Sequence, residues 1–431
     1  MIDGPPWAVA DVPFHAPPLE RDVSTDVLVV GAGAAGVLTA EAVLRRTSLR
    51  CVVVERGTVG TGATGHSAGH LATGFEIGYA ELARRRGPAA AVRAHDAFAE
   101  GRRALHAVID TWGIQCGFQE VPTGVAYARA RDLLDDLATD TALFPGDLRG
   151  ARYAANGISG LSTSASPALV TPLHPEDYRG TLLMRFPHVG VRMGAPTTLT
   201  NPRALTRLLA GALRARFPAR IAVHEHSALH GFTDYEGGYE CRVGTHRVRA
   251  RSVVFASNGN PPAPTPPTLS SSIAPSVHCM LGFVVEDGLV PHAFGWYSAD
   301  PHHDFYYGNV RPWSDGRLLL VLGGPDHLWL EGATSRDVAA FRASSHARLL
   351  AFAWKTGLVN ARTAPDFGWH GTLGYTRDGV RLICRDPRHP GIYHNSGCNG
   401  IGLLLSAYGA QQIASLLNGG QGENLFEGSH A

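Results

Sequence analysis

The sequence predicts a protein of the α/β class, in which a domain with a parallel sheet is joined to an α+β domain with an antiparallel sheet. Two short β-branched runs, at 26–30 and 51–55, flank a glycine-rich turn and a stretch with helical apolar spacing. That strand–helix–strand order is typical of a parallel sheet. Later runs of alternating character predict the antiparallel sheet, at 278–287, 303–312 and 317–324.

Composition narrows the possible partners. The chain has 431 residues, 44% hydrophobic and 17% charged, which is enough for two buried cores. A formal net charge of +1 gives no reason to expect nucleic acid or an anionic membrane as a partner. No apolar stretch reaches the ~20 residues of a membrane span, and the N-terminus lacks a signal-peptide pattern. We therefore expect a cytoplasmic protein whose six cysteines, without a CxxC pair, are reduced.

The first strand ends in the sequence GAGAAG, residues 31–36, which opens the first helix. In a Rossmann-like unit, Gly31 permits the tight turn, Gly33 lets a pyrophosphate approach the backbone, and Gly36 lets helix and strand pack closely. The helix N-terminus offers free N–H groups to phosphates. Glu55, at the end of the second strand, is placed to accept hydrogen bonds from ribose hydroxyls. Together these residues predict a dinucleotide site.

A second bare stretch, TGATGHSAGHLATG at 61–74, follows the acidic residue. Its small side chains leave the backbone free to lie along an extended ligand, which favours FAD over NAD. The spacing of His66 and His70 also occurs in metal sites, but no third ligand is spaced nearby, so we expect no metal.

The other segments follow along the chain. Residues 1–24 are proline-rich and predict an arm on the surface. Helical spacing predicts helices at 79–114, 133–144, 201–217 and 334–352, the third with an Asn cap followed by proline. A Pro/Ser-rich connector at 260–272 precedes the antiparallel strands, and two strands, a Gly-rich turn and a helix close the fold.

With these motifs the chain resembles the FAD-dependent amine and amino-acid oxidases, a family that includes D-amino-acid oxidase, glycine oxidase and sarcosine oxidase. It is most similar to the gamma-glutamylputrescine oxidase-like branch. The resemblance covers about residues 25–418, in the segments DVLVVGAGAAGVLTA, VVVERGTVGTGATGHSAG, DGRLLLVLGG, GTLGYTRDGVRLI and SGCNGIGL.

The resemblance implies a discontinuous FAD-binding domain and a substrate domain that covers the flavin ring. The implied ranges are an arm at 1–24, the FAD-binding domain at 25–80, 198–262 and 366–418, the substrate domain at 81–197 and 263–365, and a tail at 419–431.

The resemblance also assigns cofactor-binding residues. It places Gly31, Gly33, Ala34, Ala35, Gly36, Glu55 and Arg56 at the ADP end of FAD, and Gly62, Thr64, Gly65, His66, Ser67, Ala68, Gly69 and His70 along the pyrophosphate and flavin. It places Leu229 at the adenine, Asn258 and Gly259 at the return to the FAD-binding domain, and Gly400, Ile401, Gly402 and Leu403 at the pyrimidine edge of the flavin.

His66 has two interpretations. In dimethylglycine dehydrogenase-like relatives, the matching histidine is bonded to the flavin 8α-methyl group, so FAD is either covalent at His66 or merely hydrogen-bonded there. A cysteine link of the sarcosine oxidase type is disfavoured because Gly371 stands at the matching position.

Several positions depart from the family pattern. Leu373 and Gly400 stand where arginine holds a substrate carboxylate, which argues against a simple α-amino acid substrate. Ile401 replaces a frequent histidine, and Cys398 a frequent aromatic residue. The family's oxygen-activating lysine has no obvious counterpart, since Lys355 lies in the helix-like stretch AFAWKTG. We therefore expect oxygen or another electron acceptor.

Four residues are candidates for the substrate side: His70, Tyr307, Trp369 and His370. Tyr306 and Tyr307 point to opposite sheet faces, so only one meets the flavin. Aromatic walls suit a small-molecule amine, and His70 or His370 is positioned to take its proton. We expect hydride transfer from a C–N bond to flavin N5 and hydrolysis of the imine.

The alternatives are a flavin dehydrogenase or tailoring oxidase acting on an N–N or N-hydroxylated metabolite, and a flavin-binding or electron-transfer subunit without turnover. The oligomeric state is not predicted.

Overall fold

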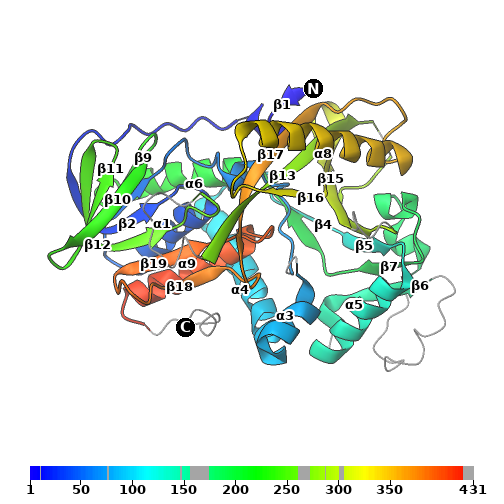
Figure 1. The fold of residues 1–431 in the computed structure, drawn as a ribbon, viewed down its shortest axis with the longest axis horizontal. Helices are drawn as coiled ribbons and strands as arrows, with labels where there is room; N and C mark the ends of the chain where they lie inside the picture. The colour runs from blue at the N-terminus through cyan, green and yellow to red at the C-terminus, as the bar shows by residue number, and fades with distance from the viewer. Residues whose placement is uncertain are drawn as a thin grey trace.

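Two large sheets dominate the computed structural model, and each forms the centre of one lobe (Figure 1). The structure describes residues 1–9, 11–74, 77–145, 148–155, 174–260, 272–286, 288–299 and 305–420. The C-terminal tail beyond residue 420 and most of the 260–272 connector lie outside these ranges.

The first sheet contains the predicted parallel strands. Within the described residues it has eight strands, and its parallel core runs in the order β9, β3, β2, β12, β19. Its strands are β2 (Val23–Val30), β3 (Cys51–Val54), β9 (Ile221–His224), β10 (Leu229–Tyr235), β11 (Gly238–Val243), β12 (His246–Phe255), β18 (Leu382–Arg385) and β19 (Ile392–Ser396).

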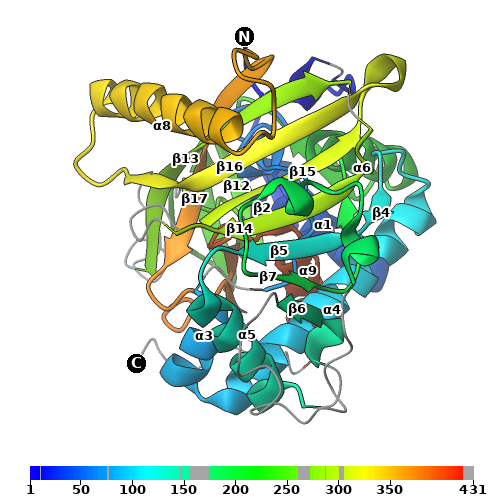
Figure 2. The same ribbon diagram turned by 90° about the vertical axis from the view of Figure 1, so that its right-hand side faces the viewer.

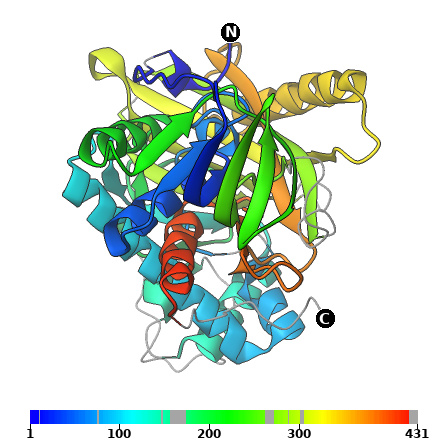
Figure 3. The same cartoon turned by 90° about the vertical axis from the view of Figure 1, so that its left-hand side faces the viewer.

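Both faces of this core are buried, which explains its unbroken β-branched runs. Val27 and Val29 pack on the face with α1 (Ala34–Arg46), α4 (Pro88–Trp112), α6 (Pro202–Arg216) and α9 (Leu403–Leu417). Leu28 and Val30 pack on the opposite face with residues of β10, β11 and β12. Figure 3 shows α9 in red beside α1 in blue, with the green strands β10, β11 and β12 alongside.

The second sheet has nine strands among the described residues, and its central pairs are antiparallel, as predicted. In spatial order they are β1 (Ile2–Asp3), β17 (Phe367–Thr376), β13 (Ile273–Val285), β16 (Leu318–Trp329), β15 (Phe305–Pro312), β14 (His292–Tyr297), β5 (Thr123–Tyr127), β7 (Gly190–Met193) and β6 (Arg152–Ala155). β4 (Gln119–Val121) and β8 (Thr197–Leu199) form a small separate pair.

Helix α8 (Ser335–Lys355) crosses one face of the nine-stranded sheet (Figure 2). On that face the ring of Tyr306 stacks on Phe352 of α8, with centroids 3.7 Å apart. Strand alternation therefore turns the next residue, Tyr307, to the other face, where it packs near Trp7 and Trp369. That second face points toward the eight-stranded sheet.

The sequence predicted several helices close to their observed positions. Asn201 caps α6 by accepting hydrogen bonds from the N–H groups of Arg203 and Ala204, at 3.2 and 3.0 Å. Thr334 and Asp337 form a capping box at the start of α8. The predicted helix at 133–144 corresponds to α5 (Ala130–Leu143), and that at 79–114 divides into α3 (Gly78–Arg86) and α4.

Two segments lie on a different side of the implied domain boundary from the one expected. β17, within the range 366–418, pairs in the nine-stranded sheet rather than in the eight-stranded one. α4, within the range 81–197, packs into the core of the parallel domain, where a Cβ at Gly101 would lie 2.2 Å from the Leu404 carbonyl oxygen of α9. Strand pairing decided the position of β17, and helix packing decided that of α4.

The N-terminal arm was predicted to lie on the surface, and for its first part that is wrong. β1 extends the nine-stranded sheet beside β17. Trp7 is only 3% exposed and packs edge-on against Trp369, with ring centroids 6.0 Å apart. Among the described residues, none of the helices has the length and apolar content that a transmembrane segment requires.

Candidate functional site

The glycine-rich turn joins β2 to α1 with contacts that only glycine allows. Gly31 has a φ of 103°, and a Cβ at Gly36 would lie 1.8 Å from the Gly31 carbonyl oxygen. The first turn of α1 faces a hydroxyl, since the Ala34 N–H donates to Thr64 Oγ1 at 3.0 Å. The two predicted pyrophosphate segments, 31–36 and 62–70, are therefore side by side.

Glu55 is fixed at the carboxyl end of β3. Its Oε2 accepts a hydrogen bond from the Ala32 N–H and its Oε1 from the Gly57 N–H, both at 2.8 Å. Each carboxylate oxygen has further lone pairs, so these bonds orient the group and leave it able to accept from ribose hydroxyls. The neighbouring Arg56 is exposed.

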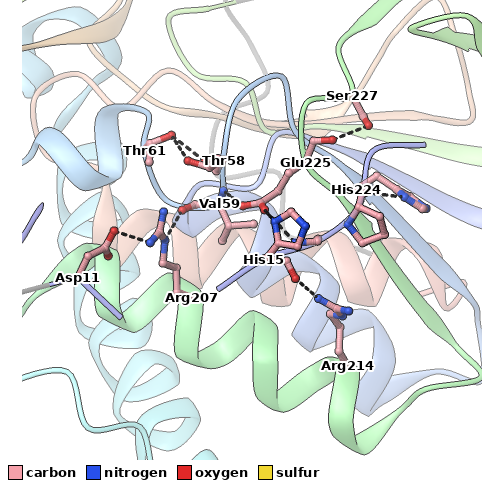
Figure 4. A network of polar contacts seen from close by, with 12 residues as sticks. Asp11, His15, Thr58, Val59, Thr61, Arg207, Arg214, His224, Glu225 and Ser227 are labelled. Atoms are coloured by element: carbon pink, nitrogen blue, oxygen red, sulfur yellow. Dashed lines mark hydrogen bonds and ion pairs between the residues drawn. The ribbon is translucent and has the colours of Figure 1, made fainter. Parts of the chain in front are cut away.

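The loop after Glu55 is held by a buried polar network (Figure 4). Glu225 is 1% exposed, and its two oxygens accept from the N–H groups of Val59 and Ala16, at 2.7 and 2.9 Å. Arg207 donates to the Val59 carbonyl and pairs with Asp11 of the N-terminal arm. The arm and α6 thus clamp the loop that leads into the bare segment.

The bare segment has its carbonyl groups bound by side chains from elsewhere in the chain. Trp7 Nε1 donates to the Gly65 carbonyl, and Trp369 Nε1 donates to the His66 carbonyl at 2.9 Å. Asn309 Nδ2 donates to the Ala68 carbonyl at 3.1 Å. We call this stretch, residues 65–70, the pinned segment.

Arg311 supplies the remaining contacts to the pinned segment. Its Nη2 donates to the carbonyls of Ala68 and Gly69, its Nη1 to Thr200 and its Nε to Asn309 Oδ1. Burial lowers the pKa of Arg311 to about 9, so the group stays charged at neutral pH. Four of its five N–H groups are engaged by these acceptors, which leaves little for a substrate carboxylate.

His66 lies against β17. A Cβ at Gly371 would come within 2.8 Å of His66 Cβ, so glycine there makes room for the histidine. His66 Nδ1 lies 3.0 Å from the Gly62 carbonyl oxygen, and a carbonyl can only accept, so Nδ1 is the donor of this hydrogen bond. His66 and Gly371, the position of the disfavoured cysteine link, are therefore neighbours.

The sheet register does not bring His370 to this face, contrary to its prediction as a substrate-side residue. His370 pairs with Cys279, whose thiol hydrogen-bonds Ser345 of α8, so both face α8. Trp369 and Tyr307 lie together on the opposite face. The backbone of His70 forms an isolated antiparallel β-bridge with Leu199. Burial of its ring, together with the charge of Arg311, lowers the pKa of His70 to about 4.

The C-terminal turn is cross-linked to the loop after β12. Asn258 Oδ1 accepts from the Cys398 N–H at 2.8 Å, and its Nδ2 donates to Cys398 Sγ at 3.3 Å. A Cβ at Gly259 would lie 2.3 Å from the Leu373 carbonyl oxygen, so the loop presses directly on β17. Residues 400–403 follow this cross-link and lead into α9, while the predicted adenine neighbour Leu229 is buried at the start of β10.

Beneath the C-terminal turn lies Arg381, 2% exposed. Its Nε donates to Asn395 Oδ1 and its Nη2 to the Asn395 carbonyl, at 2.8 and 2.9 Å. Its Nη1 lies 3.4 Å from the Gly402 carbonyl oxygen. Burial lowers the pKa of Arg381 to about 10, so it too is charged at neutral pH.

Sequence reasoning missed four residues of the site: Trp7, Asn309, Arg311 and Arg381. Asn309 and Arg311 follow Tyr307 at every second position of a strand, so alternation could have placed them on the same face. Trp7 reaches the site through tertiary packing, and nothing in the local sequence signals that.

The residues present fit FAD. A dinucleotide requires three features, and the structure has each of them. They are a helix N-terminus, here beside the Thr64 hydroxyl, an oriented carboxylate at the end of β3, and a backbone segment with few side chains. Among the described residues no cluster of three or more His, Cys, Asp or Glu side chains could hold a metal ion.

Three histidines with lowered pKa values make stability depend on pH. Burial lowers the pKa of His70 to about 4, of His278 to about 3 and of His292 to about 4, from an ordinary value of 6.5. In the unfolded chain they gain protons below pH 6.5, whereas the folded chain keeps them neutral, so the free energy of unfolding decreases as the pH falls below 6.5.

We predict a melting temperature that is constant between pH 7 and 8 and declines from pH 6.5 to 5. Substitution His292→Asn should reduce that decline, and an unchanged pH profile in this variant would contradict the assignment.

Comparison with known proteins agrees with this geometry. The family model for FAD dependent oxidoreductases (DAO) matches residues 26–416. A probable oxidoreductase, OrdL of Haemophilus influenzae strain Rd, is 23% identical over 422 residues, covering 96% of this chain and 88% of its own.

Solved structures share the fold. Glycine oxidase from Geobacillus kaustophilus has a TM-score of 0.66 at 18% identity, covering 92% of this chain and 95% of its own. NikD, described as an unusual amino acid oxidase essential for nikkomycin biosynthesis, has a TM-score of 0.64 at 15% identity, covering 91% and 94%. With the family model spanning nearly the whole chain, the protein belongs to the DAO family of FAD-dependent oxidoreductases.

Proposed function

We propose that this oxidoreductase oxidises a C–N bond of an amine, a secondary amine or an amino-acid derivative, and that the imine product is hydrolysed. The proposal is supported mainly by the side chains on one face of the nine-stranded sheet, the face that contacts the pinned segment. On β17 this face presents Trp369, Gly371, Leu373 and Tyr375, at every second position.

This face suits an amine better than a carboxylate. Aromatic rings attract a cationic or partly positive nitrogen, and apolar walls accept its carbon chain. Leu373 offers no charge, and the one arginine of β15 that faces the pinned segment, Arg311, is bonded to backbone carbonyls. The amino acid oxidases among the structural neighbours support C–N chemistry by analogy.

FAD bound at this site would accept the hydride equivalent and pass electrons to oxygen or another acceptor. The protein's own part is to position the substrate carbon and exclude water. A pKa of about 4 makes His70 a very weak base, so we infer that the substrate binds as the neutral amine. The rate at low substrate concentration should then rise with pH toward the pKa of the amine itself.

Anaerobic mixing tests the proposal. Pairs of compounds with the same carbon skeleton, one an amine and the other an alcohol, are added to the holoenzyme under nitrogen. We predict that amines bleach the visible flavin absorbance and that the matched alcohols do not. Substitution Tyr307→Leu should slow bleaching at least tenfold with FAD content unchanged, about 1.4 kcal/mol in the barrier. Bleaching by alcohols alone, or by neither series, would contradict the C–N assignment.

Readmitting air separates the acceptors. Hydrogen peroxide formed in proportion to the bleached flavin identifies oxygen as an acceptor. Flavin that stays reduced in air identifies a dehydrogenase that needs another acceptor.

We also propose His66 as the point at which the flavin would be covalently held. The hydrogen bond from Nδ1 to Gly62, which leaves Nε2 for the flavin, and the room beside Gly371 support this role. After acid denaturation, a covalent flavin stays on the precipitated polypeptide, and His66→Ala releases it to the supernatant. Yellow supernatant from the unmodified protein would leave His66 as a hydrogen-bonding neighbour only.

A further inference from the structure

The N-terminal arm contacts both lobes and, between them, the loop that follows Glu55. β1 pairs with β17 of the nine-stranded sheet, and residues 16–19 contact the segment 225–227 beside the parallel sheet. Figure 1 shows the arm in blue, running from β1 across to the lobe of the parallel sheet. On its way the arm reaches residues 57–65, which we call the FAD loop.

We propose that Asp11 and Trp7 are positioning residues for FAD, and that the arm acts as a latch. With the arm docked, the FAD loop stays in place and FAD is retained. FAD enters and leaves when the arm detaches. The proposal rests on FAD binding, and not on the identity of the substrate.

Two buried side chains hold the arm and the FAD loop together (Figure 4). Glu225 accepts hydrogen bonds from the N–H groups of Val59 and Ala16, at 2.7 and 2.9 Å. Arg207 donates to the carbonyl groups of Val59 and Val12, at 3.0 and 3.1 Å. Val59 is fully buried, so its position depends on these two partners. Detachment of the arm removes one hydrogen bond from each partner and thereby loosens Val59.

Asp11 gives two neighbouring arginines of α6 their counter-charge. Its Oδ2 lies 2.7 Å from Arg203 Nη2 and 2.5 Å from Arg207 Nη1. Within the described ranges, no other acidic side chain forms an ion pair with either arginine. Burial and the charge of Arg207 lower the pKa of Arg203, because like charges disfavour each other. Loss of Asp11 would leave two like charges beside the FAD loop, and removing one partner of a buried ion pair is strongly destabilising.

Trp7 holds the other end of the FAD loop. Its ring is buried, and its Nε1 donates to the Gly65 carbonyl. The arm thus fixes the loop near residue 59 and again at residue 65. Between these points lies Thr64, whose hydroxyl accepts from the Ala34 N–H at the N-terminus of α1. We infer that docking of the arm sets the position of Thr64 relative to that helix.

The contacts of the arm allow it to detach while both sheets stay intact. β1 is an edge strand whose ladder with β17 has two residue pairs. Other contacts come from single groups, such as Asp3 with Arg342 and the Leu19 N–H with Ser227. A segment with few backbone hydrogen bonds opens locally at a lower cost than global unfolding. By linkage, if docking of the arm retains FAD, bound FAD favours docking by the same factor.

Hydrogen exchange tests this reciprocity on the full chain. The protein carries His66→Ala, so that no covalent link holds the flavin, and is compared with and without FAD. The amides of Ala16 and Leu19 report docking because they donate to Glu225 and Ser227. We expect FAD to slow their exchange at least tenfold more than that of the β11 amides. Equal slowing in the arm and in β11, or none in the arm, would overturn the proposal.

Rates of FAD exchange test the latch itself. In the same background, Asp11→Asn should release FAD at least tenfold faster, as measured by the fluorescence of free FAD after dilution, whereas Asp11→Glu should retain most of the slow release. Trp7→Phe keeps an aromatic ring but lacks the N–H donor, so it should release FAD at least threefold faster. The control Asp22→Asn changes an exposed arm residue that accepts from the Arg247 N–H of β12, and it should leave the release rate unchanged.

The association rate distinguishes a latch from a damaged site. A weakened latch is open for more of the time, so Asp11→Asn should bind FAD at least as fast as the reference protein. Slower association combined with faster release would contradict the latch, and so would unchanged release in both Asp11→Asn and Trp7→Phe. Should Asp11→Asn fail to fold, Trp7→Phe decides. None of these assays involves an amine, so their outcome is independent of the C–N assignment.

Discussion

The fold of the site depends on the capture of one bare backbone segment by side chains of the opposite sheet. Residues 65–70 expose carbonyl groups, and Trp369, Asn309 and Arg311 bind three of them from the nine-stranded sheet. An unpaired buried carbonyl costs about 1–3 kcal/mol, so these donors fix both the segment and the contact between the lobes.

This arrangement explains why the segment is poor in side chains and yet rich in neighbours. Gly69 could not become alanine without a Cβ 2.2 Å from the Thr200 carbonyl oxygen. Trp7 closes the remaining side from the N-terminus, where Arg311 lies over its ring at 5.3 Å. The cofactor site is thus a joint product of the N-terminal segment, the parallel sheet and the antiparallel sheet.

Local signals and tertiary ones contributed differently to what the sequence could predict. Gly31, Gly36 and Glu55 were predictable because each acts within one strand–helix–strand unit, whose geometry is local. His370 was misassigned because a strand's two faces differ by a single position, and the register with β13 decides which face is which. Trp7 and α4 needed knowledge of packing between segments far apart in the chain, which no motif encodes.

Side chains of the nine-stranded sheet hold the pinned segment in the conformation that FAD binding requires. The FAD dissociation constant of Asn309→Leu tests this most directly, because Asn309 is fully buried and bonds both Ala68 and Arg311. The exposed Asn360 provides a matched Asn→Leu control. We predict at least tenfold weaker FAD binding for Asn309→Leu, about 1.4 kcal/mol, with cooperative unfolding retained and the control unchanged. Unchanged FAD affinity in Asn309→Leu would contradict it.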